Sequence, residues 1–265
     1  MRPTILLVND DGVSSLGLLI MKDELEKLGH VTVVAPRDKR SGAGKSITVH
    51  NPIKMMKVQL SDGSEAYAIT GTPADAYFFA SDKILRHTPD LLVSGINLGD
   101  NVGIDSVLSS GTMGAAFEAA IHGVPAISAS CYVQRLPTAR EDGEVSIREL
   151  KLTASITAKV AEYVLKNGMP EGIDVISINV PKGADPRKIK ITKIYYKGYR
   201  NVYIEREGGY EMRWDFSVHP DAGPDTDLYV VRKEGYISIT PIKIRFFHEK
   251  DGLKDLLSFL LSSAE

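Results

Sequence analysis

The sequence predicts an α/β protein in which helices flank a Rossmann-like, mostly parallel sheet, with an antiparallel β-hairpin extension and a C-terminal helix. In residues 1–182, short apolar strand patterns alternate with helical patterns, which is typical of a parallel sheet. Residues 183–250 are rich in β-branched and aromatic residues with glycine at the turns, which predicts a β-rich extension. Residues 251–265 return to helical spacing, with leucines on one face.

The first strand is the apolar run 4–8, and a turn signal follows it at once: Asn9-Asp10-Asp11-Gly12. Such a run predicts a buried strand, and open α/β sheets bind ligands outside the carboxyl ends of these strands. Two adjacent carboxylates repel each other unless a proton or a cation lies between them. A hard divalent cation with oxygen ligands is the simplest resolution. The alternative is that one aspartate only caps the following helix.

Further elements alternate along the rest of the first 182 residues. Apolar spacing predicts helices over 16–28, 72–86, 111–122 and 148–167. Strand patterns cover 31–35, 90–94, 125–130 and 174–180. Residues 46–70 differ, because turn residues separate three short strand patterns there, which predicts an inserted β-meander. These three patterns cover 46–49, 53–60 and 67–69.

The second half is predicted to contain hairpins and one terminal helix. Strand patterns cover 189–197, 202–206, 210–218, 228–231 and 236–239. The helix predicted within 251–265 has an apolar face, which either folds back on its own core or docks on a neighbouring subunit.

Composition excludes several classes of protein. The net charge of −2 over 265 residues gives no support for binding to nucleic-acid polymers or membrane surfaces through bulk electrostatics. No apolar stretch approaches the length of a membrane span. The single cysteine, Cys131, excludes an internal disulfide and fits a reducing compartment. The first residues lack a secretion signal, so we expect a cytoplasmic location.

A loop rich in glycine and hydroxyl groups follows the second strand at 40–46. It is not an ATPase-type phosphate loop, because only one residue separates Gly42 from Gly44 and no helical pattern follows. A weaker prediction remains, that this loop brings a hydroxyl and its backbone close to a ligand. An ordinary flexible loop is the alternative.

Two later segments also carry candidate chemistry. Asn97 follows a buried strand and offers a neutral oxygen that could complete a cation site begun by Asp10 and Asp11, although it could simply hydrogen-bond within its loop. A second cluster, Ser110-Gly111-Thr112, directly precedes a helix rich in small residues. The N–H groups and dipole of a helix start favour an anion, whereas ordinary capping explains only one of these hydroxyls.

Together these segments predict a metal ion held by oxygen ligands beside a phosphate pocket. That combination fits metal-assisted hydrolysis of a phosphate ester. None of the six histidines adjoins the motifs, so we expect oxygen ligands alone.

The chain closely resembles the SurE (survival protein E) family of metal-dependent nucleotidases. Matching strings occur in family order at 5–12, 35–36, 40–42, 71–75, 94–97, 110–112, 226–227 and 235–241. The resemblance implies hydrolysis of nucleoside 5′- or 3′-monophosphates to nucleoside and phosphate, with short polyphosphate as a further substrate. It also implies a homodimer that exchanges its C-terminal segment and can pair into a homotetramer.

The resemblance also implies a role for each matching residue. One divalent cation, Mg²⁺ or Mn²⁺, would be bound by Asp10, Asp11, Ser41 and Asn97, with one of the two aspartates as the catalytic base. The phosphate-binding residues would be Ser110, Gly111 and Thr112. Supporting residues would be Asn9, Gly42 and Asn101. The chain departs from the family at Ser109, where a tyrosine is usual, and at 133–145, which has no clear counterpart.

Two other functions also fit acidic residues after the first strand or the same fold. A receiver domain or an aspartyl-phosphate enzyme also places acidic residues after its first strand. However, a receiver is about half this length and needs a lysine after a late strand, where Lys182 lies beyond a proline. A non-catalytic nucleotide sensor with the same fold would bind nucleotide without releasing phosphate.

Overall fold

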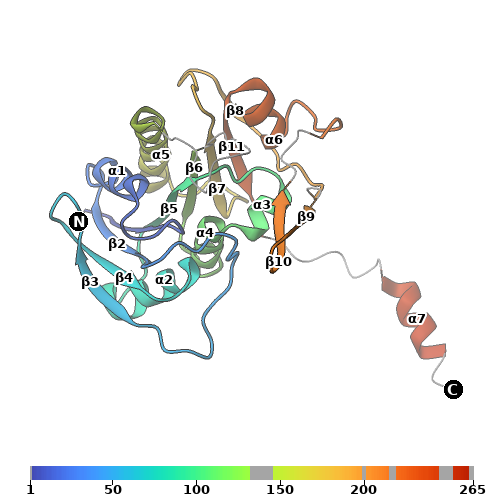
Figure 1. Cartoon of the computed structure of the whole chain (residues 1–265), viewed down its shortest axis with the longest axis horizontal. Coiled ribbons are helices and arrows are strands. Elements are labelled where there is room, and N and C mark those ends of the chain that lie inside the picture. Colours follow the sequence, from blue (N-terminus) through green and yellow to red (C-terminus); the bar gives the residue numbers. More distant parts are fainter. Residues whose placement is uncertain (1, 132–145, 199–200, 215–218, 245–252, 263–265) are drawn as a thin grey trace.

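The structure is a computed structural model that describes residues 2–131, 146–198, 201–214, 219–244 and 253–262. Within these residues, nine strands form one sheet in the order β3-β4-β2-β1-β5-β6-β7-β11-β8 (Figure 1). They are β1 (Thr4–Val8), β2 (His30–Pro36), β3 (Met55–Gln59), β4 (Glu65–Ile69), β5 (Leu91–Leu98), β6 (Ala126–Cys131), β7 (Val175–Val180), β8 (Ile189–Ile191) and β11 (Ile237–Ile242). A separate hairpin pairs β9 (Asn201–Arg206) with β10 (Gly209–Trp214).

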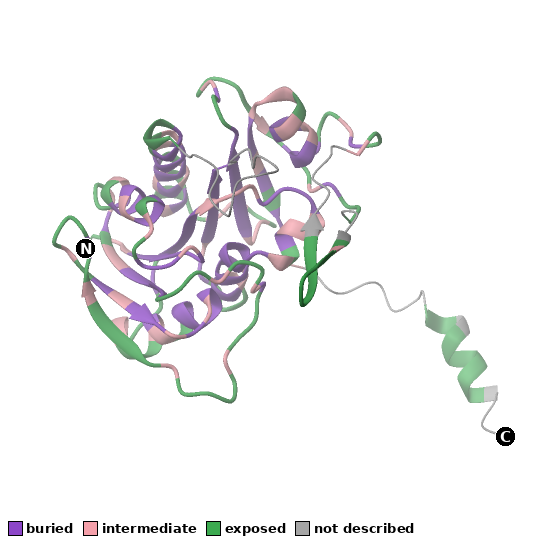
Figure 2. Ribbon diagram, in the orientation of Figure 1, coloured by how far each residue is buried: buried purple, intermediate pink, exposed green. Residues whose placement is uncertain are grey.

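Helices cover both faces of the nine-stranded sheet. The α-helices are α1 (Leu16–Leu25), α2 (Pro73–Phe79), α3 (Ile104–Ser109), α4 (Gly111–Ile121), α5 (Ile147–Asn167), α6 (Asp227–Tyr229) and α7 (Lys254–Ser262). Two π-helical turns, η1 (Ala80–Leu85) and η2 (Val230–Glu234), continue α2 and α6. Helices α1 and α5 pack against one face, while α2 and α4 pack against the other. The strands between them are almost entirely buried (Figure 2).

Strand β1 shows why this arrangement forms. Its side chains alternate between two apolar clusters, with Ile5 and Leu7 in one and Leu6 and Val8 in the other, and all four are fully buried. A strand that is apolar on both faces is stable only between two layers of helices. The continuous apolar run is therefore the sequence signature of this central strand.

The predicted fold class is confirmed, since β2, β1, β5, β6 and β7 are neighbours in parallel. The prediction of an inserted three-stranded meander at 46–70 is wrong. Residues 46–49 form no strand, and β3 and β4 form a hairpin that joins the main sheet, because β4 pairs in parallel with β2. The sheet edge supplies hydrogen-bond partners that a free-standing meander would lack.

The antiparallel extension is confirmed as the β9–β10 hairpin. The strand predicted at 236–239 is present as β11, which pairs antiparallel with β7 in the main sheet. Of the strand predicted at 189–197, only 189–191 form a strand, β8, which pairs with β11. The strand predicted at 228–231 is wrong: this segment is helical in α6 and η2. Thr226 starts the helix by accepting a hydrogen bond from the amide of Tyr229, so a local cap overrides the β-branched composition.

The predicted C-terminal helix is present as α7, which lies apart from the sheet and has an exposed apolar surface (Figures 1 and 2). Residues 133–145, singled out from the sequence, lie outside the described residues. No helix in the described part of the chain is both long and apolar enough to cross a membrane. Cys131 is buried at the end of β6, and burial raises the pKa of its thiol to about 11.

Candidate metal and phosphate site

The polar residues predicted to form the site gather at the carboxyl edge of the sheet, where β1 and β5 are neighbours. Asn9 shapes the turn after β1, because its side chain donates to the carbonyl of Gly12 at 3.0 Å and accepts from the Gly12 amide at 3.2 Å. Gly12 itself has a φ of 102°, which a side chain rarely adopts. The turn therefore fixes the direction in which Asp10 and Asp11 leave the strand.

Asp10 is only 4% exposed, and the first turn of α4 holds its carboxylate. The hydroxyl of Thr112 donates to Oδ1 at 2.6 Å, and the Thr112 amide donates to Oδ2 at 3.2 Å. Burial, followed by the neighbouring charge of Asp11, raises the pKa of Asp10 to about 6 despite these two bonds. A buried carboxylate beside a second carboxylate is the electrostatic situation that a bound cation relieves.

Asp11 connects the first strand to the β5 loop. Its Oδ2 accepts a hydrogen bond from the amide of Leu98 at 2.9 Å. Its Oδ1 lies 3.3 Å from the ammonium of Lys39, which is therefore a cation beside the carboxylate pair. Lys39 was not among the predicted site residues, because a lysine in a charged loop gives no distinctive signal.

Ser41 is placed near Asp10 through the backbone, since the amide of Arg40 donates to the Asp10 carbonyl at 2.7 Å. Both Ser41 and Gly42 are exposed. The same loop is held from α4, because the Gly44 amide donates to the Ser109 carbonyl at 2.8 Å.

Two contacts with α4 fix this loop further along. A Cβ on Gly114 would lie 2.1 Å from the carbonyl oxygen of Gly44, so only glycine permits the approach. Lys45 forms an ion pair with the buried carboxylate of Glu118. The loop that carries Ser41 is therefore positioned by the helix whose first turn holds Asp10.

Asn97 lies at the end of β5 and is partly buried. Its Nδ2 donates to the Gly99 carbonyl at 2.7 Å, so the amide oxygen is the atom that could bind a cation. Asn101 is buried and anchors the loop. Its backbone amide donates to Asn179 Oδ1 at 2.8 Å, and its side-chain Nδ2 donates to Ser130 Oγ at 2.9 Å. These bonds make Asn101 a support of the loop.

The start of α4 brings two of its three predicted residues, Gly111 and Thr112, against Asp10. Ser110 caps the helix, since its Oγ accepts from the amide of Met113 at 3.2 Å. A Cβ on Gly111 would lie 2.9 Å from the Asp10 Cβ, so glycine is needed for this approach. The donors of Thr112 are used by Asp10 in this structure. The phosphate role of the three residues stays a prediction.

The loop 99–103, which follows β5, is also held from the C-terminal part of the chain, and no sequence pattern predicts this contact. Asp227 is 1% exposed, and its carboxylate accepts from the amides of Gly103 at 2.9 Å, Tyr195 at 2.9 Å and Leu228 at 2.7 Å. Burial outweighs these bonds and raises the pKa of Asp227 to about 6.

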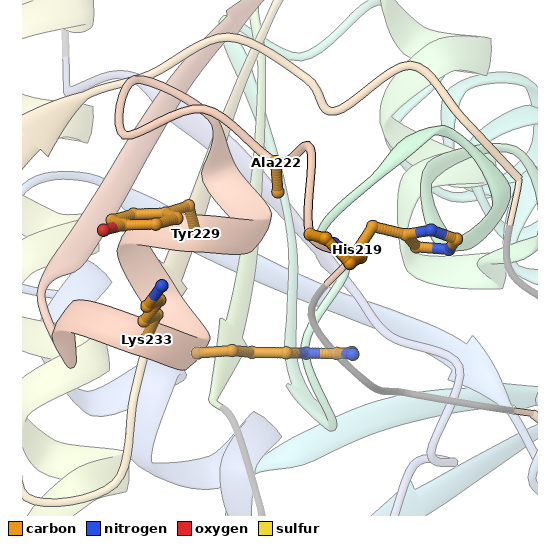
Figure 3. A pocket seen from close by; sticks show the side chains of 6 residues that line it. His219, Ala222, Tyr229 and Lys233 are labelled. Carbon is orange, nitrogen blue, oxygen red and sulfur yellow. The ribbon is translucent and has the colours of Figure 1, made fainter.

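A cavity of about 320 Å³ lies beside this C-terminal part (Figure 3). Its walls are His219, Pro220, Ala222, Tyr229, Arg232 and Lys233. Tyr229 and Lys233 come from the α6–η2 turn, and Figure 3 shows them across from the loop of His219 and Ala222. None of the predicted metal or phosphate residues lines it.

The residues present suit a hard divalent cation. The described part of the chain has no group of three or more His, Cys, Asp and Glu side chains that could hold a metal ion. A cation at Asp10 and Asp11 therefore needs neutral oxygen ligands as well, and Ser41 and Asn97 are the nearby candidates. Carboxylate, hydroxyl and amide oxygens are ligands that Mg²⁺ and Mn²⁺ accept.

The fold and this polar cluster define the class: an α/β protein whose oxygen donors lie at the carboxyl edge of a parallel sheet, beside a helix N-terminus. A family model described as "Survival protein SurE" matches residues 5–201. The chain therefore belongs to the SurE family.

Curated relatives and a solved structure agree with this family. The 5′-nucleotidase SurE of Methanothermobacter thermautotrophicus is 41% identical over 202 residues, covering 76% of each chain. That of Methanosarcina acetivorans is 39% identical over 251 residues, covering 92% of this chain and 93% of its own length. The crystal structure of the SurE protein from Aquifex aeolicus superposes with a TM-score of 0.73 at 30% identity, covering 98% of this chain and 100% of that one.

Proposed function

We propose that this chain is a metal-dependent 5′-nucleotidase that hydrolyses nucleoside monophosphates to nucleoside and phosphate. The observation that carries the proposal is the Asp10–Thr112 contact, which joins a buried carboxylate to a helix N-terminus at the carboxyl edge of the sheet. Relatives with 36–41% identity share the name 5′-nucleotidase SurE. We extend the proposal to 3′-monophosphates and short polyphosphate as further substrates.

We propose one Mg²⁺ or Mn²⁺ as the cofactor, with Asp10, Asp11, Ser41 and Asn97 as its ligands. When bound, such a cation polarises a phosphoryl oxygen and lowers the pKa of a coordinated water. The chain's own contribution is positioning: Thr112 orients Asp10, while the amide of Leu98 orients Asp11.

The start of α4 is the proposed phosphate subsite. Its partial positive charge favours an anion, and Gly111 lets the substrate phosphate approach the backbone closely. Either Asp10 or Asp11 accepts the proton of the attacking water in this proposal. Asn9, Gly42 and Asn101 support the surrounding turns.

We also propose that the protein is a homodimer or homotetramer in the cytoplasm. The exposed leucines of α7 support an exchange of the C-terminal segment between subunits, since an apolar face of this kind gains stability when a partner covers it. The lone, buried Cys131 supports a reducing compartment.

The test is phosphate release from nucleoside 5′- and 3′-monophosphates with Mg²⁺, with Mn²⁺ and with EDTA. We expect metal-dependent release that EDTA abolishes. Asp10→Asn should lower turnover at least about 100-fold, the scale seen when a charged transition-state contact is lost. Asp82→Asn, at an exposed site in η1, is the matched control and should leave turnover unchanged. Nucleotide binding without release under any metal would instead support a sensor.

A further inference from the structure

A buried ion pair joins the α6–η2 segment to the loop that follows Asn97 and Leu98 at the end of β5. The guanidinium of Arg232 donates from Nε to Asp100 Oδ2 and from Nη2 to Asp100 Oδ1, both at 2.7 Å. The two side chains are 4% and 5% exposed, although 132 residues separate them in sequence. Two-pronged arginine–carboxylate pairs of this kind fix orientation as well as distance.

Asp100 is three residues after Asn97, and short contacts connect the two. Asn97 donates to the carbonyl of Gly99, directly before Asp100. On the other side, the amide of Leu98 donates to Asp11. A displacement of Asp100 would therefore also move Asn97 and Leu98, and the Leu98 amide is the hydrogen-bond donor to Asp11.

The ion pair is one of two contacts that the α6–η2 segment makes to this loop. The α6–η2 segment holds the same loop a second time, through Asp227 and the amide of Gly103. On its other side, Arg232 borders the cavity of Figure 3, so side-chain packing is incomplete there. Without the guanidinium, the loop would keep the Asp227 contact at Gly103 but lose its hold at Asp100, which is nearer to Asn97 in sequence.

We propose that Arg232 is a positioning residue for the cation site: by holding Asp100 it fixes the loop that presents Asn97 and orients Asp11. The proposal rests on the proposed metal-dependent function. We therefore expect the affinity for the metal ion to depend on Arg232, since groups that orient metal ligands typically contribute about 10–100-fold to that affinity.

The experiment compares wild type with Arg232→Met by measuring Mn²⁺ binding directly, through calorimetry or the spin-resonance signal of free Mn²⁺. We expect the Mn²⁺ Kd to rise at least about tenfold. The Mn²⁺ concentration for half-maximal phosphate release should rise in parallel, while kcat at saturating Mn²⁺ changes less than about threefold. Arg187→Met is the control, because Arg187 forms an exposed pair with Asp185 and should bind Mn²⁺ like wild type.

A double variant separates positioning from general destabilisation. Arg232→Met alone leaves the Asp100 carboxylate without its guanidinium, so its melting temperature is expected to fall. Asp100→Asn with Arg232→Met removes both charges and should recover much of that stability. If Arg232 acts by positioning the loop, the Mn²⁺ Kd of the double variant should stay above that of wild type. Mn²⁺ affinity that recovers together with stability would overturn the proposal.

The outcomes also distinguish this inference from the proposed function. If Arg232→Met binds Mn²⁺ like wild type and wild type releases phosphate, only the inference is wrong. If wild type binds Mn²⁺ but releases no phosphate, the nucleotidase proposal fails while the two Kd values still decide the role of Arg232. If wild type binds no Mn²⁺, both proposals are wrong.

Discussion

Thr112 donates hydrogen bonds to both carboxylate oxygens of Asp10, from its hydroxyl at 2.6 Å and from its backbone amide at 3.2 Å. The two residues are 102 positions apart, and they join the end of β1 to the first turn of α4. Both bonds favour the charged carboxylate, which opposes the effect of its burial. The orientation of Asp10 therefore depends on the position of α4.

Thr112→Val should test this dependence, because valine keeps the shape and the backbone amide but loses the hydroxyl. We expect kcat/KM for a nucleoside 5′-monophosphate to fall about tenfold, as the strongest contact that orients Asp10 is lost. The free energy of unfolding should fall by about 1.5–3 kcal/mol, the scale of a hydrogen bond to a charged group. Thr112→Ser restores a hydroxyl and should recover most of both losses. Unchanged kcat/KM in Thr112→Val would contradict the assigned role.

Gly111→Ala should displace Asp10 directly. The new Cβ would lie 2.9 Å from the Asp10 Cβ and 3.1 Å from its Oδ2. Alanine is otherwise the better helix former by about 1 kcal/mol, so a loss can be assigned to the contact. We expect Mn²⁺ affinity and turnover to fall at least about tenfold. Gly209→Ala, where no atom lies within 4 Å of the added Cβ, is the control and should match wild type.

Much of the fold could be predicted from the sequence because its signals are local. The apolar run of β1, the helix start at Thr72 and Pro73, and the apolar period of α5 each involve residues only a few positions apart. The strand predicted at 228–231 failed because those β-branched residues also suit a buried helical turn, and the cap at Thr226 favours the helix.

The place of the candidate site at the sheet edge was also predictable, whereas its internal contacts were not, and the roles of its residues stay a prediction. Asp10 and Asn97 follow strand patterns, so their shared edge follows from the rule for parallel sheets. No local pattern pairs Thr112 with Asp10 or Arg232 with Asp100, since sequence spacing carries no information about contacts more than 100 residues apart. Three-dimensional packing was needed to find them.

Gly114→Ala should disturb the loop that carries Ser41 without touching either aspartate. The added Cβ would lie 2.1 Å from the Gly44 carbonyl oxygen, so the loop must shift away from α4. If Ser41 is a ligand, Mn²⁺ affinity should fall at least about tenfold. Ala115→Ser adds one atom at the next position of α4 and serves as a volume control for the melting temperature. Wild-type Mn²⁺ affinity in Gly114→Ala would argue against Ser41 as a ligand.

The exposed apolar face of α7 predicts an oligomer that depends on this helix. Leu256 and Leu260 are one helical turn apart and both exposed. Leu256→Lys with Leu260→Lys should lower the molar mass measured by light scattering, because a charged face cannot be buried against a partner. Ser258→Lys adds a lysine to another face and should keep the wild-type mass. A wild-type protein that is already a monomer would contradict the proposed exchange.

The buried carboxyl of Asp227 predicts how stability depends on pH. Burial raises its pKa from 3.8 to about 6 in the folded protein. Between these values the folded state binds more protons than the unfolded state, so the contribution to stability is present below about pH 4 and is lost as pH rises through 6. The shift corresponds to at most about 3 kcal/mol. Asp10 contributes with the same sign when no metal is bound.

Chemical unfolding in EDTA at several values between pH 4 and 7 should isolate this contribution when wild type is compared with Asp227→Asn. The variant places an amide against the N–H of Gly103, so it should be less stable than wild type at pH 4. Because it cannot titrate, its disadvantage should shrink as pH rises through 6 and the wild-type carboxyl becomes charged. Asp225→Asn is the control. An ion pair with Lys193 lowers the pKa of Asp225, so the pH dependence that Asp225 adds to stability lies below pH 4, outside the tested range. A gap between wild type and Asp227→Asn that stays constant from pH 4 to 7 would show that Asp227 does not titrate in this range.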